Sequence, residues 1–350
     1  MIFELTLFLI SFMSIDEFLR DLLEGDLLRG EEKHVSFRML VPEISYEYVE
    51  ESRKEYFPPY VARRAIRRLT KRGDIVLDPL AFSGTVAMEA YSHGRIALVR
   101  PLEPSLEIFI RANLINPREV LWTDVYRGII SLKASTKKHV PGCTLENVYD
   151  PKTFEELKRL WGGVSELPEK IKYVITAALL RVSRNTSVKD PLKEVEREAR
   201  RIYERAASFA SSIRYRGSIE ITYKRGEIGS LAITALPKRG IVRGRYLELC
   251  RLGYSEEDIG RMAHSEPPED EEEYVEYVLK ALKDYESERV ALYGGDHISI
   301  IRSMRNRLER LGRRHLGTLI DEKYGALLVI SRRLFDASYG LIYHPLNTLR

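Results

Sequence analysis

Residues 74–94, which read DIVLDPLAFSGTVAMEAYSHG, decide the fold class of this chain. The first seven residues are apolar except for two aspartates, and such a run is typical of a strand buried on both faces of a parallel sheet. Ser83, Gly84 and Thr85 then make a short turn of small residues. The apolar segment after them predicts a helix closed by Gly94.

The pattern continues outward from this stretch. Residues 97–102 predict a second strand and residues 105–114 a second helix, so that strand, turn, helix, strand and helix follow one another as a βαβ unit. We therefore expect a doubly wound α/β domain. Further strands are expected at 218–223, 231–235 and 326–331, and further helices at 61–69, 244–253, 272–287 and 299–314.

The middle of the chain interrupts the sheet. Residues 153–212 have a long helical pattern with Lys and Arg on one side. The sequence predicts an α/β domain over residues 57–350, with a mostly helical insertion at about 140–216. Residues 1–56 are expected to form an N-terminal helical extension. Met13 is the expected true first residue, and an interfacial anchor at residues 1–12 is the alternative.

Composition narrows the function classes. The 350 residues carry 56 Lys and Arg against 52 Asp and Glu, a net charge of +4 that permits a nucleic-acid partner. Two cysteines cannot make a disulfide framework, and without a CxxC pair or an HExxH motif we expect no metal site. No stretch is long enough to span a membrane, so the expected location is cytoplasmic. A GxxxxGK[ST] phosphate loop and a Ser/His/Asp order are also absent from the sequence.

At this point the sequence resembles a known family. Residues 78–85 (DPLAFSGT) look like the S-adenosylmethionine-binding motif of the amino-directed DNA methyltransferases, which methylate N4 of cytosine or N6 of adenine and usually have Asp-Pro-Phe-x-Gly-Ser-Gly-Thr. Residues 57–60 (FPPY) are similar to the Phe-Pro-Pro before that motif. Residues 233–238 (ITALPK) stand where the catalytic Ile-Thr-Ser-Pro-Pro-Tyr is expected. The resemblance runs in patches from about Phe57 to Ile330.

The resemblance implies a Rossmann-like methyltransferase sheet with S-adenosylmethionine as cofactor. The turn after the first strand would hold the methionine part, because turn N–H groups and the helix dipole favour a carboxylate there. Glu103 would accept from the ribose hydroxyls and Glu227 from the adenine amino group. The residues expected around the cofactor are Asp78, Pro79, Ser83, Gly84, Thr85, Glu103 and Glu227, and those of the catalytic loop are Ala235, Leu236, Pro237 and Lys238.

Three departures from the family pattern each indicate that the methylation activity is impaired. Phe82 stands where the family has glycine, and Pro101 where it has the ribose-binding aspartate, with Glu103 two residues on as a substitute on the same strand face. In residues 235–238, Ala replaces an acceptor oxygen, Leu the first proline and Lys the stacking aromatic. An exocyclic amino group needs such acceptors, and a lysine is no stacking platform for a flipped base.

The sequence therefore predicts a methyltransferase-like protein of the DNA N4/N6 amino type with impaired activity, and a nucleic-acid partner, with DNA favoured over RNA. One alternative is a catalytically inactive, nucleic-acid-binding member of the family, which a Phe82 ring filling the cofactor pocket would favour. The other is a methyltransferase that acts on tRNA. Residues 181–189 form a basic polar loop that is a candidate for target recognition or a plain surface loop. For the arginine-rich helix at 302–314 an ion-paired, solvated face is favoured over phosphate contact.

Overall fold

The computed structural model describes residues 13–14, 32–36 and 57–331, except for 146, 224–226, 238–239, 296 and 322–324. Most of the expected N-terminal extension, including its helix, lies outside these residues, and so does Lys238. The strands are β1 (Met13–Ser14), β2 (Glu32–Ser36), β3 (Ile75–Ala81), β4 (Ile96–Pro101), β5 (Ser218–Ile221), β6 (Glu227–Ala235), β7 (Tyr285–Gly295), β8 (Arg314–Asp321) and β9 (Gly325–Ser331).

Helices surround the strands and also form a block of their own. The helices are α2 (Pro59–Leu69), α3 (Thr85–Ser92), α4 (Ser105–Asn113), α5 (Trp122–Ala134), α6 (Pro151–Gly163), η1 (Val164–Glu166), α7 (Glu169–Arg184), α8 (Pro191–Ser212), α9 (Ile241–Gly244), α10 (Tyr246–Arg251), α11 (Glu256–His264), α12 (Glu271–Lys283) and α13 (Ile298–Arg310).

The described strands form one mixed sheet in the order β1-β2-β8-β9-β7-β6-β3-β4-β5. From β5 to β7 the strands are parallel, and β9 runs antiparallel to both of its neighbours, β7 and β8. Counted from β3, the five parallel strands take the order 3-2-1-4-5, which is that of a doubly wound sheet up to its fifth strand. The expected α/β class is confirmed, and the sheet is compatible with a Rossmann-like fold.

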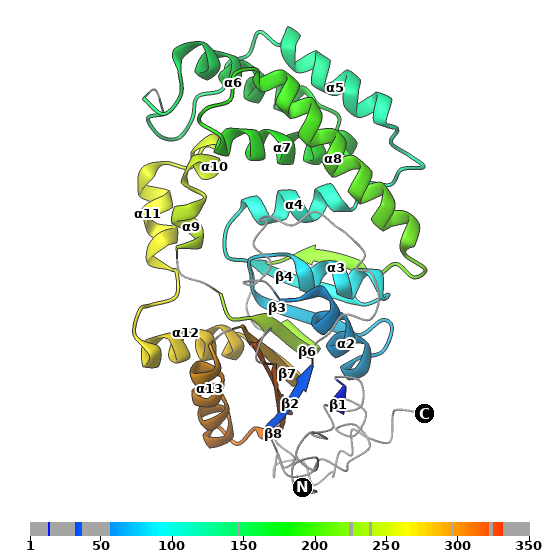
Figure 1. The fold of residues 1–350 in the computed structure, drawn as a ribbon, viewed down its shortest axis with the longest axis vertical. Coiled ribbons are helices and arrows are strands. Elements are labelled where there is room, and N and C mark those ends of the chain that lie inside the picture. Colours follow the sequence, from blue (N-terminus) through cyan, green and yellow to red (C-terminus); the bar gives the residue numbers. More distant parts are fainter. Residues whose placement is uncertain are drawn as a thin grey trace, which may run out of the picture.

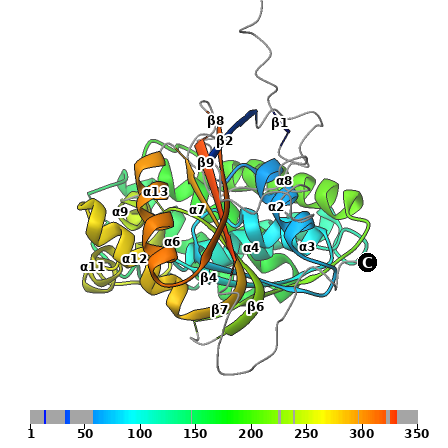
Figure 2. The same ribbon diagram turned by 90° about the horizontal axis from the view of Figure 1, so that it is seen from below.

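Helices cover both faces of the sheet (Figure 2). One face carries α12 and α13, and the other carries α2 and α3. The central strand β3 shows why its sequence is continuously apolar: Val76 belongs to the apolar cluster of α2 and α3, whereas the next residue, Leu77, belongs to the cluster of α12 and α13. A strand covered on both faces needs apolar side chains at both alternating positions.

Four of the described strands were missed by the sequence prediction. Strands β1 and β2 lie in the segment 1–56, which was expected to be helical, so that expectation is wrong for these residues. The other two, β7 and β8, lie where helices were expected to continue. The helix expected at 272–287 ends with α12 at Lys283, and the long strand β7 begins at Tyr285. The helix expected to reach residue 314 ends with α13 at Arg310, and β8 begins at Arg314. Gly312, in the left-handed region at φ 77°, makes the turn between them. In both places a strand follows a helix within four residues, so a helical reading of the pattern extended over the boundary.

The helical insertion is larger than expected. Figure 1 shows α5, α6, α7 and α8 as one block above α4, at the end of the molecule away from α13. The block begins at Trp122 rather than near residue 140, because α5 packs against α6, α7 and α8. It lies between α4 and β5 in the chain, and its most extensive contacts with the rest of the domain are those of α4 with α7 and α8 and of α10 with α7.

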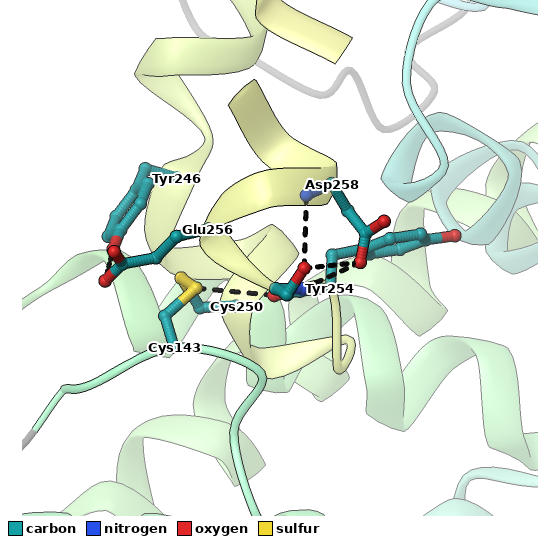
Figure 3. Close-up of a disulfide and its surroundings, with 7 residues drawn as sticks. Cys143, Tyr246, Cys250, Tyr254, Glu256 and Asp258 are labelled. Carbon is teal, nitrogen blue, oxygen red and sulfur yellow. Dashed lines mark hydrogen bonds between the residues drawn. A yellow bond between two sulfur atoms is a disulfide. The ribbon is translucent and has the colours of Figure 1, made fainter. Parts of the chain in front are cut away.

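A disulfide joins this block to the second half of the domain. Cys143, in the loop before α6, is bonded to Cys250 in α10, 107 residues later in the chain (Figure 3). The sulfur of Cys143 lies 3.3 Å from the carbonyl oxygen of Tyr254. Arg251, which follows Cys250 in the chain, is buried. Its guanidinium carbon lies 5.0 Å from the ring centre of Tyr149 and 5.1 Å from that of Phe154. The two cysteines therefore form a single cross-link, although they make no framework.

Two further observations concern only the part of the chain that the structure describes. None of its helices combines the length and the apolar character that a bilayer crossing requires. It also brings together no group of three or more His, Cys, Asp or Glu side chains suited to a metal ion.

Candidate functional site at the carboxyl ends of the central strands

The strand order reverses between β3 and β6. From β3 the chain adds β4 and then β5 on one side of β3, and it later adds β6 and then β7 on the other side. In open α/β sheets ligands bind at such a point, outside the carboxyl ends of the strands. The sequence-predicted residues Asp78 and Glu103 and the loop 235–237 lie toward this edge: in the second half of β3, just after β4 and at the end of β6, respectively. The topology therefore brings these expected residues to the same side of the sheet, but not Glu227.

Asp78 is a buried carboxyl group at this edge, with 4% of its surface exposed. Burial raises its pKa from 3.8 to about 7, although hydrogen bonds from the Thr234 side chain and the Leu80 backbone act in the opposite direction. Within the described structure its Oδ1 atom has no hydrogen-bond partner. Near neutral pH this group is thus divided between the acid and the carboxylate, whereas binding of a cationic group needs the carboxylate.

The turn formed by Ser83, Gly84 and Thr85 has hydrogen bonds between its own residues. The hydroxyl groups of Ser83 and Thr85 lie 3.0 Å apart, and the backbone N–H of Thr85 donates to the Ser83 oxygen at 3.4 Å. Gly84 has φ 76°, and a Cβ atom there would lie 3.1 Å from the Ile110 side chain of α4. The glycine is therefore required by the left-handed backbone and by the close approach of α4, without any ligand.

Phe82 fills the space where the resembling family has glycine. Its side chain is 4% exposed and belongs to the apolar cluster that contains residues of α3 and α4. Pro79, in the same segment, is also buried. The ring is therefore packed as a core residue.

Glu103 is already engaged in a buried ion pair. One of its oxygens accepts from the guanidinium of Arg245, and the other accepts from the backbone N–H of Ser105 at 2.7 Å. The same guanidinium nitrogen donates to the Ser105 hydroxyl at 3.1 Å. Glu103 is 2% exposed and Arg245 1% exposed. Both carboxylate oxygens of Glu103 are thus used inside the protein, at the position where ribose hydroxyls would have to be bound.

The loop after β6 is similarly closed. Ala235 and Leu236 are buried, and the backbone N–H of Leu236 donates to the Tyr293 carbonyl at 2.8 Å. The carbonyl oxygen of Pro237, the one acceptor that the catalytic pattern retains, accepts from the Tyr274 hydroxyl at 2.7 Å. Tyr274 comes from α12 and is itself buried. An incoming base amino group would therefore have to compete with an internal hydrogen bond.

Glu227 is not part of this site. It is the first residue of β6 and pairs with Tyr285, the first residue of β7. Since these strands are parallel, Glu227 lies at the amino ends of the strands, on the opposite edge of the sheet from Asp78. The expected role toward adenine is incompatible with this position, because the strand begins at Glu227 rather than ending there.

Three cavities of the described structure lie away from these residues. A cavity of about 570 Å³ lies between α7 and α8, one of about 670 Å³ lies beside the disulfide, and one of about 240 Å³ lies between α12 and α13. None of these three is lined by Asp78, Glu103 or residues 83–85. The residues at the switch point do not fit S-adenosylmethionine, because the ribose acceptor is ion-paired, the turn is packed against α4 and Phe82 adds a buried ring.

Sequence reasoning missed Arg245 and Tyr274, which close the site. Each meets its partner across a long stretch of chain: Arg245 is 142 residues from Glu103, and Tyr274 is 37 residues from Pro237. Neither residue belongs to a motif with a fixed spacing. A weak signal was available for Arg245, since it lies in the segment 244–253 that reads as a helix and a carboxylate was expected near β4.

Comparison with known proteins adds no relative: no family model, curated protein or solved structure matches the chain.

Proposed function

We propose that this chain is a non-catalytic member of the amino-directed DNA methyltransferase family: a Rossmann-like methyltransferase fold with a helical insertion that binds nucleic acid and neither binds S-adenosylmethionine nor transfers a methyl group. The proposal rests on the resemblance of residues 78–85 and 233–238 together with the closed site around them.

The observation that carries the proposal is the buried ion pair between Glu103 and Arg245. Removing one partner of such a pair leaves an uncompensated buried charge, which costs about 3–5 kcal/mol. A cofactor that used Glu103 would have to meet a cost of this kind before gaining any contact. Two further features also oppose ligand binding: the buried ring of Phe82 next to the turn at residues 83–85, and the Tyr274–Pro237 hydrogen bond in the loop after β6.

The basic surface supports a nucleic-acid partner but not through α13. Arg307 of that helix is ion-paired with Glu276 of α12 at 2.7 Å, and Ser303 donates to Glu271 at 3.0 Å. The ion-paired alternative for this helix is thus supported. In the helical block, the 570 Å³ cavity is lined by the arginines 181, 184, 197 and 201 and the glutamates 194 and 198. Arg184 is paired with Glu248, Arg197 with Glu194 and Arg201 with Glu198, so this cavity is largely neutralised as well.

Calorimetry and a binding assay test the proposal together. We expect no heat of binding when millimolar S-adenosylmethionine or S-adenosylhomocysteine is titrated into the full chain, and binding of a fluorescent 24-mer nucleic acid in the micromolar range. Asp78→Asn is the matched variant: cofactor binding that this substitution abolishes would place the cofactor at the switch point. Micromolar cofactor affinity together with base methylation would overturn the proposal, and so would a failure to bind duplex DNA, single-stranded DNA and RNA alike.

One observation favours a second candidate, an active methyltransferase. The Oδ1 atom of Asp78 is buried without a hydrogen-bond partner in the described structure, and such an atom is a natural acceptor for a ligand ammonium group. Methyl transfer to a defined oligonucleotide, measured with S-adenosylmethionine labelled at its methyl group, distinguishes the two. DNA and RNA substrates in parallel assays then separate a DNA enzyme from a tRNA enzyme.

A further inference from the structure

Three chain segments that enter neighbouring parallel strands carry basic residues just before the strand begins. Lys71 and Arg72 precede β3, Arg95 precedes β4, and Arg214 and Arg216 precede β5. Because β3, β4 and β5 are adjacent and parallel, these segments meet at the amino ends of the strands. Figure 1 shows how α8 runs from the helical block down to this end of the domain, next to α3.

The segments are in direct contact around one aromatic ring. The guanidinium carbon of Arg72 lies 3.3 Å from the ring centre of Tyr215, and that of Arg214 lies 5.4 Å from it. Tyr215 also forms an isolated parallel bridge with His93. We call Arg67, Lys71, Arg72, Arg214, Tyr215 and Arg216 the amino-edge cluster. All six are exposed.

The charges of this cluster are not neutralised locally. Among the described residues, its five cations form no ion pair with a carboxylate. The nearby acid is Asp74, whose side chain accepts from the backbone N–H of Lys71 at 2.8 Å. Burial, together with repulsion from Arg63, Arg67 and Arg95, lowers the pKa of His93 to about 4, so this imidazole is neutral near pH 7. Arg95 itself is buried and donates to Thr70.

We propose that the amino-edge cluster is the surface on which this protein holds the phosphate backbone of a nucleic acid. The inference rests on the proposed function and locates it on the edge of the sheet opposite Asp78. Guanidinium groups bind phosphate oxygens through paired N–H donors, and an arginine stacked on a tyrosine is held in place before it binds. Exposed Tyr215 adds an aromatic edge beside these cations, a combination that suits single strands as well as duplexes.

The experiment compares two double variants of the full chain by fluorescence anisotropy. Arg72→Gln/Arg214→Gln removes two charges from the cluster. Arg127→Gln/Lys133→Gln removes two charges from exposed positions on α5, outside it. At about 0.1 M salt the first variant is expected to bind at least about ten-fold more weakly, and the slope of log affinity against log salt to fall by roughly 1.8 for duplex DNA. The second variant is expected to bind as the unmodified chain does.

Arg72→Lys/Arg214→Lys keeps both charges and is expected to retain the salt slope, and thermal unfolding checks that all variants are folded. Duplex DNA, single-stranded DNA and RNA are tested separately, which identifies the source of the phosphate. Equal weakening in both glutamine variants, or none in either, would overturn the inference while the proposed function stood. No binding of any nucleic acid by the unmodified chain would overturn both. Loss of binding to vesicles with phosphatidylserine, with nucleic-acid affinity unchanged, would assign the cluster to a lipid surface instead.

Discussion

The buried carboxyl group of Asp78 bears both on cofactor binding and on the pH dependence of stability. In a methyltransferase its carboxylate would bind the cofactor, and here burial holds it near the point of half-protonation. Its pKa is raised above the unfolded value, so the native state binds more protons than the unfolded state between about pH 4 and pH 7. The stability that this group contributes is therefore fully present below pH 4 and is lost as the pH rises through 7.

Asp78→Asn is accordingly expected to stabilise the protein above pH 7 and to leave it nearly unchanged at pH 4. A shift of this size corresponds to a few kcal/mol at most, at about 1.4 kcal/mol per pKa unit. Urea unfolding of both proteins at pH 4, 6 and 8 measures the difference. An equal effect at all three pH values would show that the carboxyl group does not titrate as burial requires.

At the scale of the element, the turn before α3 is a structural feature in its own right. Gly84→Ala places an L-residue at φ 76° and a Cβ atom 3.1 Å from Ile110, so we expect a loss of at least roughly 1–2 kcal/mol and a fall in Tm of a few degrees. Gly73→Ala is the control, because it also has positive φ (83°) but meets no atom within 4 Å. If Gly84→Ala costs no more than Gly73→Ala, packing against α4 contributes nothing to the need for glycine.

The elements also show what could be predicted from the sequence. The buried strands β3 and β4 and the helix α2 were predicted close to their bounds, because local apolar runs and Gly or Pro positions define them. For β6 only the end was predicted, since the strand begins at Glu227 and not at residue 231. Strands β7 and β8 were not predicted, because each directly follows a helix. At the candidate site, the locations of Asp78 and residues 235–237 followed from the strand ends. The Glu103–Arg245 pair could not be predicted, because two residues that are 142 positions apart share no local sequence pattern.

At the scale of the whole molecule, the disulfide ties the helical block to α10. Its loop of 107 residues corresponds to about 4.7 kcal/mol in the chain-entropy treatment of a cross-link. Reduction with a phosphine is expected to lower Tm by several degrees, and the Cys143→Ala/Cys250→Ala variant is expected to unfold at the lower temperature with or without reductant. Calorimetric scans of the two proteins measure this. A reductant effect that persists in the variant would have a cause other than this bond.

The position of the helical block in the chain has a consequence during synthesis. Strand β4 ends at Pro101, and its neighbour β5 begins only at Ser218, after the whole block. At the usual rates of translation this separates the two strands by on the order of ten seconds. During that interval the outer edge of β4 presents unpaired backbone groups, which are a template for aggregation. The helical block packs largely within itself and against α4, all of which precede β5 in the chain, so it is able to fold before β5 emerges and covers this edge.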